Sequence, residues 1–194
     1  VGSVNELKEL VSKSGNRYFL MRHGEAESNV RGVVTSETTG NGMTERGRAQ
    51  VFDSLGSLKK EKIDLILASD LVRVRETAEM VATGLGCETS KIIYDERLRE
   101  LNFGVFSGKT IEQYHAYFQN EKERFETRPE NGENLDDLRS RVMRLLYDLE
   151  AEYKGRNILI ISHGDPTWLM QLYSHSQNVS YLLNGEVKMI DFAP

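Results

Sequence analysis

Short apolar runs alternate along this chain with longer amphipathic segments, and this alternation constrains the fold more than any other feature of the sequence. The apolar runs are typical of strands that are buried on both faces of a parallel sheet. We predict strands at residues 18–21, 63–68, 91–95, 157–162 and 187–192, the last of them an edge strand. We predict helices at residues 44–60, 70–85, 110–126 and 135–153, with Ser69 as the cap of the second, and a further helix that Asp165 caps. Loops are expected at 30–43 and 96–108.

Strands that alternate with helices indicate an α/β fold, here a three-layer α/β/α sandwich with a mainly parallel central sheet and one edge strand. The 194 residues, of which 39% are hydrophobic, suit one domain with its own core, which we place at residues 17–194. Residues 1–16 are expected to form an N-terminal helix or linker, with Val4 to Ser14 amphipathic. Because the chain begins with Val, we keep open both a processed chain and a domain excised from a larger, fused protein.

Charge and composition argue against several partners. The formal net charge of -5 argues against a nucleic-acid partner, because such domains usually carry a basic face. No apolar run approaches the roughly 18 residues that span a membrane, so we expect no membrane partner. The single cysteine, Cys87, excludes an intrachain disulfide and suits a reducing, cytoplasmic setting. Homo-oligomerisation stays open.

Polar side chains follow the carboxyl ends of four predicted strands. They are Arg22, His23, Arg73, Glu100 and His163. Because ligands of open α/β sheets bind beyond the carboxyl ends of the strands, we expect these side chains to meet there. Each of them alone has an ordinary structural explanation, and their joint placement is what indicates a site.

This set of side chains suits phosphate chemistry. Arginine guanidinium groups match phosphate oxygens in pairs, and a neutral imidazole is a competent nucleophile. A second imidazole, if protonated, could hold charge that develops on the transferred group. A carboxylic acid can protonate a leaving alkoxide and then deprotonate water. Gly24 and Gly164, one after each histidine, would leave room for phosphate near the backbone.

A zinc site is the competing chemical interpretation, since His23, His163 and Asp165 are all possible ligands. The neighbouring arginines would repel a cation, and the chain has no H-x-x-x-H or C-x-x-C spacing. We therefore expect neither a metal nor another cofactor.

Several segments resemble, in the same order, the motifs of the histidine phosphatase superfamily, the phosphoglycerate mutase-like group. They are RHGEAESN at 22–29, MTERGRAQ at 43–50, SDLVRVRETAE at 69–79, RLRELNFGVFSGKTIEQ at 97–113, ENGENLDDLRSRV at 130–142 and ISHGD at 161–165. The resemblance covers nearly the whole chain.

The resemblance implies a metal-independent mechanism with a phosphohistidine on His23. The implied catalytic residues are His23, Glu100, His163, Arg22 and Arg73, with Glu100 as the proton donor. The implied substrate-binding residues are Arg22, Gly24, Asn29, Arg73, His163 and Gly164. Glu25 is expected to line the pocket less directly, and Glu133 is a further possible pocket residue.

The chain departs from the family pattern at the rim of the expected pocket. Asn134 stands where the family usually has Ser, and Phe106-Ser107 stands for a usual Trp-Glu pair. The segment after His163 is also short for the family. These departures leave the choice of substrate open.

The resemblance leaves three functions to distinguish. We favour hydrolysis of a small phosphorylated substrate, because the segment 105–134 is compact where the family's mutases carry a longer insertion. The alternatives are phosphoglycerate mutase-type transfer, and a phosphate-binding regulatory or interaction domain of a larger protein with little turnover.

The compact segment also carries side chains that could contact the rest of a substrate. An aromatic cluster, Tyr114, His115, Tyr117 and Phe118, either packs on the sheet or forms a lid over the substrate. Arg124 and Arg128 either remain solvated or hold a second anionic group.

Overall fold

The computed structural model describes residues 9–10, 13–174 and 178–191, and its centre is one mixed sheet. The strands are β1 (Arg17–Arg22), β2 (Leu65–Ala68), β3 (Ile93–Tyr94), β4 (Asn157–Ser162) and β5 (Val187–Ile190). Their order is β3-β2-β4-β1-β5, and β5 pairs antiparallel with β1 while the other pairs are parallel. The predicted parallel sheet with one edge strand is confirmed.

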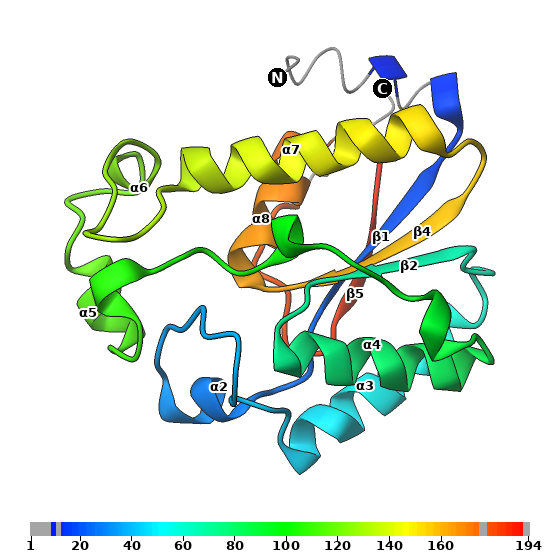
Figure 1. Ribbon diagram of the computed structural model, residues 1–194, viewed down its shortest axis with the longest axis horizontal. Helices are drawn as coiled ribbons and strands as arrows, with labels where there is room; N and C mark the ends of the chain where they lie inside the picture. The colour runs from blue at the N-terminus through cyan, green and yellow to red at the C-terminus, as the bar shows by residue number, and fades with distance from the viewer. Residues whose placement is uncertain (1–8, 11–12, 175–177, 192–194) are drawn as a thin grey trace.

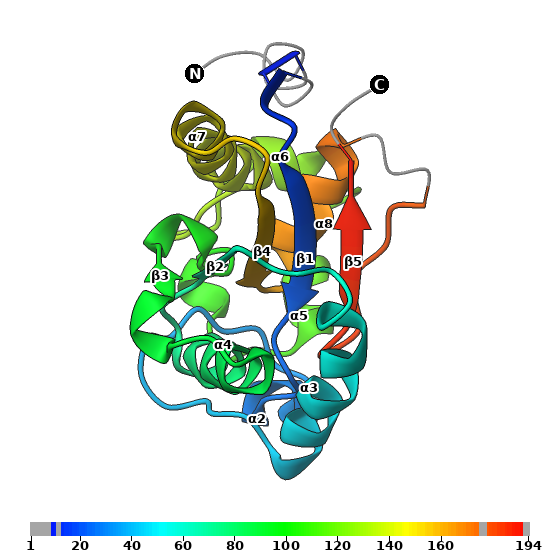
Figure 2. The same ribbon diagram turned by 90° about the vertical axis from the view of Figure 1, so that its right-hand side faces the viewer.

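Helices cover both faces of the sheet (Figures 1 and 2). On one face lie α3 (Glu45–Leu58) and α4 (Val72–Leu85), and on the other lie α7 (Leu135–Glu152) and α8 (Gly164–Tyr173). The predicted three-layer sandwich is therefore confirmed.

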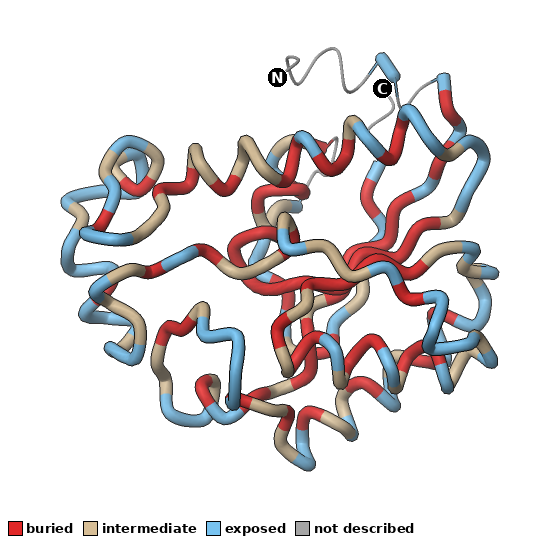
Figure 3. Tube along the Cα trace, in the orientation of Figure 1, coloured by how far each residue is buried: buried red, intermediate tan, exposed pale blue. Residues whose placement is uncertain are grey.

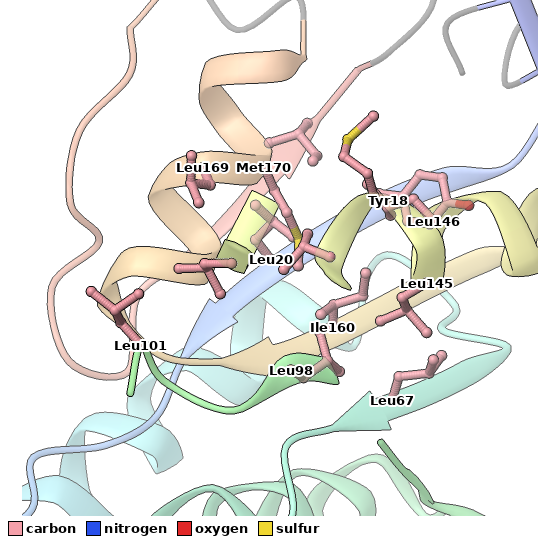
Figure 4. Packing of buried hydrophobic residues seen from close by; sticks show 14 of the residues in the cluster. Tyr18, Leu20, Leu67, Leu98, Leu101, Leu145, Leu146, Ile160, Leu169 and Met170 are labelled. Atoms are coloured by element: carbon pink, nitrogen blue, oxygen red, sulfur yellow. The ribbon is translucent and has the colours of Figure 1, made fainter. Parts of the chain in front are cut away.

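Successive residues of each central strand point into opposite cores. Leu20 and Ile160 pack with α7 and α8, whereas Phe19 and Ile161 pack with α3 and α4. Figure 4 shows the first of these cores, and Figure 3 shows that buried positions run through the middle of the sheet. Because both faces are covered, each residue of a central strand gains roughly 1.5–3 kcal/mol from burying a large apolar side chain. This is why these strands read as unbroken apolar runs.

Short helices and loops gather beyond the carboxyl ends of the strands (Figure 1). The helices are α2 (Glu27–Arg31), α5 (Ile111–His115) and α6 (Glu123–Glu126). Single 3-10 turns occur at Thr89–Lys91, Glu96–Leu98 and Gly104–Phe106. The expected helix at 110–126 is thus two short helices. The expected loop 30–43 begins later than predicted, because α2 extends to Arg31.

Two predicted helix caps are wrong. The cap position of α4 is Leu71 and not Ser69, whose hydroxyl lies 2.9 Å from His163 Nε2 and accepts from Leu71 N at 3.4 Å. The cap position of α8 is His163, which makes Asp165 the second residue of the helix. In both places a side chain expected to cap a helix has its own contact in the region of the strand ends.

The predicted N-terminal helix at 4–14 lies largely outside the described residues, of which 9–10 and 13–14 are helical. Within the part of the chain that the structure describes, no helix has both the length and the apolar character that crossing a membrane requires.

A close approach of two glycines joins the start of α3 to the loop after β1. A Cβ atom on Gly47 would lie 2.1 Å from the Glu25 carbonyl oxygen, and one on Gly24 would lie 2.4 Å from the Gly47 carbonyl oxygen. Thr44 begins the helix at this point, since its hydroxyl accepts a hydrogen bond from Gly47 N at 3.0 Å. The absence of side chains here lets α3 pack directly on the backbone that carries His23.

We therefore expect Gly47→Ala and Gly56→Ala, two substitutions in the same helix, to have opposite effects on stability. Gly47→Ala should destabilise the fold by about 1–3 kcal/mol, because backbone atoms must move to admit the methyl group. Nothing lies within 4 Å of a Cβ on the exposed Gly56, so Gly56→Ala should stabilise by about 0.5–1 kcal/mol through helix propensity. Urea unfolding measures both, and equal effects would contradict the proposed close packing.

Candidate active site

Two histidines lie side by side at the carboxyl edge of the sheet because they follow adjacent parallel strands. Arg22 of β1 is in register with Ser162 of β4, and the His23 amide donates to the Ser162 carbonyl at 3.1 Å. His23 and His163 are the next residues, and their ring centroids are 5.2 Å apart at an angle of 66°. Both rings are buried. The predicted meeting of these two residues is therefore seen in the structure.

The surroundings of His23 define its tautomer. Nδ1 lies 2.7 Å from the Gly24 carbonyl oxygen, which can only accept, so Nδ1 carries the ring proton. Nε2 then holds the lone pair, and it accepts from Arg73 Nε at 3.2 Å. Burial, together with the charges of Arg73 and Arg22, holds the pKa of His23 well below its usual value. A neutral ring with its lone pair on Nε2 can attack phosphorus.

Two arginines supply positive charge beside this ring. Arg73 lies in the first turn of α4, and its Nη2 donates to the Thr35 carbonyl at 3.2 Å. Burial lowers the pKa of Arg73 to about 10, which leaves it protonated at neutral pH. Arg22 donates from Nη1 to the Leu182 carbonyl at 2.9 Å, while its buried Nε has no partner among the described residues. Both arginines line the cavity, and guanidinium groups suit binding of phosphate oxygens.

His163 contacts Ser69, whose hydroxyl oxygen lies 2.9 Å from His163 Nε2. Its Nδ1 is buried and has no partner in the described part of the chain. Burial, and then the charge of Arg73, hold the pKa of His163 well below its usual value. Protonation of His163 is therefore disfavoured. The positive charge at this edge comes from Arg22 and Arg73.

Glu100 is fixed by two backbone amides. Oε1 accepts from Leu101 N at 2.9 Å, and Oε2 accepts from Gly164 N, at the start of α8, at 3.1 Å. Burial, and next the negative charge of Asp165, raise the pKa of Glu100 to about 7. A carboxyl group that exchanges its proton near neutral pH suits both general acid and general base chemistry.

The loop that carries Glu100 is held in place by Arg141 of α7. Its Nη1 donates to the carbonyls of Arg97 and Arg99 at 2.7 and 2.8 Å, and its Nη2 donates to the Glu100 carbonyl at 3.0 Å. Glu133 completes the arrangement through a salt bridge of 3.0 Å to Arg141. These hydrogen bonds from Arg141 hold the backbone of the loop in place.

A cavity of about 270 Å³ opens over these side chains. Its lining includes Arg22, His23, Asn29, Arg73, Glu100 and Gly164 at the strand ends, and Val33, Val34, Phe103, Ile111, Tyr114, His115, Arg124, Asp165 and Tyr181 farther out. His163 lies behind the lining. The predicted catalytic residues are thus brought together, and the outer lining includes Tyr114, His115 and Arg124 from the compact segment.

The reason given for Gly24 is wrong, because Gly24 does not line the cavity and its missing side chain makes room for Gly47. A Cβ on Gly164 would instead lie 3.7 Å from Glu100 Oε2 and 3.9 Å from Arg22 Cζ. Clearance for phosphate at Gly164 agrees with this placement and stays a prediction.

Glu25 and Glu133, expected at the pocket, lie elsewhere, and Arg128 is at the surface, which is one of the two places considered for it. Glu25 accepts from the Thr44 hydroxyl at 2.8 Å, and Glu133 pairs with Arg141, so neither lines the cavity. Arg128 pairs with Asp137 on the exposed surface. Each of these charges is satisfied by a partner from its own neighbourhood.

The aromatic cluster divides between packing and lining. Tyr114 and His115 line the cavity, whereas Tyr117 and Phe118 do not. Tyr114 is buried, and its ring meets those of Phe103 and Phe118 edge-on, at centroid distances of 4.9 and 5.2 Å. The cluster is therefore mainly packing, with one of its faces turned to the cavity.

Several residues of the site carried no usable signal in the sequence. Ser69, Arg141 and Tyr181 are ordinary residues in their own segments, and their partners lie 94, 41 and 57 positions away in the chain. Among the described residues, no group of three or more His, Cys, Asp or Glu side chains could hold a metal ion.

The fold and the site define a protein of the histidine phosphatase superfamily. The model of branch 1 of that superfamily matches residues 18–188, and the chain belongs to this family.

Known relatives include both mutase-like proteins and phosphatases. A probable phosphoglycerate mutase of Escherichia coli, GpmB, is 32% identical over 151 residues, which cover 75% of this chain and 68% of that protein. The structure of YhfR from Bacillus stearothermophilus is 25% identical, covers 90% of both chains and superposes with a TM-score of 0.74. A mycobacterial glucosyl-3-phosphoglycerate phosphatase in complex with VO3 shares the fold at 23% identity, a TM-score of 0.74 and coverage of 90% and 94%.

We expect the His23 ring to be neutral and protonated on Nδ1 at pH 6.5, because burial and two arginines oppose its charge and the Gly24 carbonyl accepts its proton. Ring ¹⁵N chemical shifts distinguish this tautomer directly, with His23→Gln for assignment. A cationic ring, or a proton on Nε2, would contradict the interpretation of the site.

Proposed function

We propose that this protein is a phosphatase that hydrolyses small phosphate monoesters through a phosphohistidine on His23, without a metal. The proposal rests on the neutral His23 ring, the two arginines beside it and the carboxyl group of Glu100 that titrates near neutral pH. Family membership supports the same chemistry.

In the first half-reaction, His23 Nε2 attacks phosphorus and the ester P–O bond breaks. Glu100 gives its proton to the leaving alkoxide, so that the alcohol departs neutral. Arg22 and Arg73 bind the phosphoryl oxygens, and their charge offsets the charge of the transferred group. The Gly24 carbonyl keeps its hydrogen bond to Nδ1 and so steadies the ring as it becomes cationic.

In the second half-reaction, the ionised Glu100 takes a proton from water, and the resulting hydroxide attacks phosphorus. The P–N bond breaks, inorganic phosphate leaves, and Nε2 regains its lone pair. Glu100 ends protonated, as it began. The pKa of Glu100, near 7, suits a group that has to act in both directions.

The charge balance of the cavity favours hydrolysis over mutase-type transfer. A phosphoglycerate mutase has to hold the carboxylate of its substrate as well as the phosphoryl group, which calls for a further cation. The third arginine of the lining, Arg124, is paired with Asp165 at 2.9 Å and with Glu121 at 2.7 Å. No other arginine or lysine remains free for a second anion in the described lining.

Two further proposals accompany this one. We place the catalytic unit at residues 17–194, which the family match to residues 18–188 supports. We also keep the cytoplasmic setting, which rests on the single cysteine.

We expect the wild-type protein to release phosphate from 3-phosphoglycerate or from a panel of esters faster than it forms 2-phosphoglycerate in the presence of a bisphosphate primer. His23→Ala should abolish phosphate release while its circular dichroism spectrum stays unchanged. Coupled assays for phosphate and for the isomer measure the two outcomes together.

Rapid quenching with labelled ester should trap an acid-labile label on wild-type His23. Isomer formation that outpaces phosphate release would favour the mutase. Ligand binding without any turnover would favour the regulatory domain, and residual turnover in His23→Ala would contradict the mechanism.

We expect kcat/KM for an alkyl phosphate to fall above a pH of about 7, because Glu100 must be protonated to donate and its pKa lies near 7. Glu100→Gln should lower that kcat/KM by about 10²–10⁴-fold. The same variant should lose far less on p-nitrophenyl phosphate, whose leaving group departs without a proton. Equal losses on both esters would contradict a proton-donating role.

A further inference from the structure

The reaction steps above leave Asp165 unused, although it lies in the cavity lining. Its Oδ1 accepts from Arg124 Nη2 at 2.9 Å and from the Tyr181 hydroxyl at 2.8 Å. Its Oδ2 has no hydrogen-bond partner in the described part of the chain, and this oxygen is not enclosed by protein. Asp165 follows directly on Gly164, whose amide binds Glu100, so it stands next to the leaving-group side of the reaction.

The charges around Asp165 leave no unpaired cation among the described residues at this end of the cavity. Arg124 is 3% exposed and contacts two carboxylates, those of Asp165 and Glu121, so its single positive charge is more than matched. The opposite end holds Arg22 and Arg73 beside His23. The cavity thus has two positive charges where the phosphoryl group would lie and, where the alcohol part would lie, a carboxylate with its counter-ion.

Much of the outer wall is apolar and would contact the carbon atoms of the alcohol. Val33, Val34, Phe103 and Ile111 line it, with the ring of Tyr114. The cavity volume of about 270 Å³ is below the roughly 300–1,000 Å³ of pockets for drug-sized ligands. A compact alcohol with carbon atoms against this wall, and one polar group toward Asp165, fits both features.

We propose that Asp165 determines substrate specificity: its free carboxylate oxygen accepts a hydrogen bond from a hydroxyl group of the alcohol and excludes alcohols that carry an anion. The substrates are then phosphate monoesters of small, uncharged polyols. This inference rests on the proposed phosphatase activity. A neutral hydroxyl suits the site better than an ammonium group, because the Asp165 charge already has Arg124 as its counter-ion.

Two natural esters test the proposal as a matched pair. Glycerol 3-phosphate and 3-phosphoglycerate differ only in a CH₂OH group in place of a carboxylate. We expect wild-type kcat/KM to be at least about tenfold higher for glycerol 3-phosphate, because one unfavourable contact of this kind discriminates by that much or more. Propyl phosphate, which lacks both hydroxyl groups, should also be at least about tenfold poorer. Equal or faster hydrolysis of 3-phosphoglycerate would overturn the proposal.

Asp165→Asn tests the role of the residue itself. The substitution removes the repulsive charge and releases that of Arg124, so the preference for glycerol 3-phosphate over 3-phosphoglycerate should fall at least about tenfold. Any change that the substitution causes in Glu100 acts on both esters and cancels in the ratio. An unchanged ratio would overturn the proposal.

The matched control is Asp148→Asn. It removes a carboxylate that forms a salt bridge with Arg97 at the surface, where the Asp148 side chain is 60% exposed. It should leave the ratio within about twofold; a shift as large as that of Asp165→Asn would overturn the assignment to Asp165. If Asp165→Asn does not fold, the wild-type comparison of the three esters decides alone. Faster hydrolysis of 3-aminopropyl phosphate than of glycerol 3-phosphate would overturn the choice of a neutral alcohol.

Failure of the phosphatase proposal itself has a different signature. In that case wild-type protein would release phosphate from none of these esters and would carry no label on His23. Turnover of every ester without discrimination would leave the phosphatase standing and overturn only the specificity proposal.

Discussion

The hydrogen bond from the His23 amide to the Ser162 carbonyl is the contact on which the rest of this site depends. It continues the parallel register of β1 and β4 one residue beyond both strands, and so it fixes two imidazole rings 5.2 Å apart. The apolar cores bury these strands on both faces, and buried core strands are the elements that open last. Preorganisation of the site is therefore a consequence of sheet packing, and the arginines and Glu100 only have to be brought to an edge that already exists.

The sequence was sufficient for the parts of this arrangement that follow from strand order. Apolar runs and helical periods predicted the sheet and its two helical layers, and the strand ends predicted that Arg22, His23, Arg73 and Glu100 would meet. Periodicity did not predict what the chain does between elements. The segment 110–126 breaks into α5 and α6, because its aromatic rings pack on one another and on the Glu100 loop instead of forming one continuous helix.

The remaining errors share a physical cause, which is that partners far away in the chain decide where a side chain lies. Ser69 and Asp165 both had the residue type of a helix cap, but the first contacts His163 and the second binds Arg124. The Arg124–Asp165 pair joins positions 41 residues apart, and no local pattern specifies such a contact. Gly24 is a backbone example of such a distant partner. The absence of its side chain makes room for the carbonyl oxygen of Gly47.

The charge of Asp165 affects both proton transfer by Glu100 and the proposed choice of substrate. Burial and this carboxylate raise the pKa of Glu100, whereas the Leu101 amide and the arginines lower it, and the balance lies near 7. A group that must first donate and then accept a proton needs that balance undisturbed. A leaving group with its own negative charge would meet repulsion from Asp165. A neutral alcohol would not, so the same carboxylate that helps to raise the pKa of Glu100 also disfavours anionic alcohols.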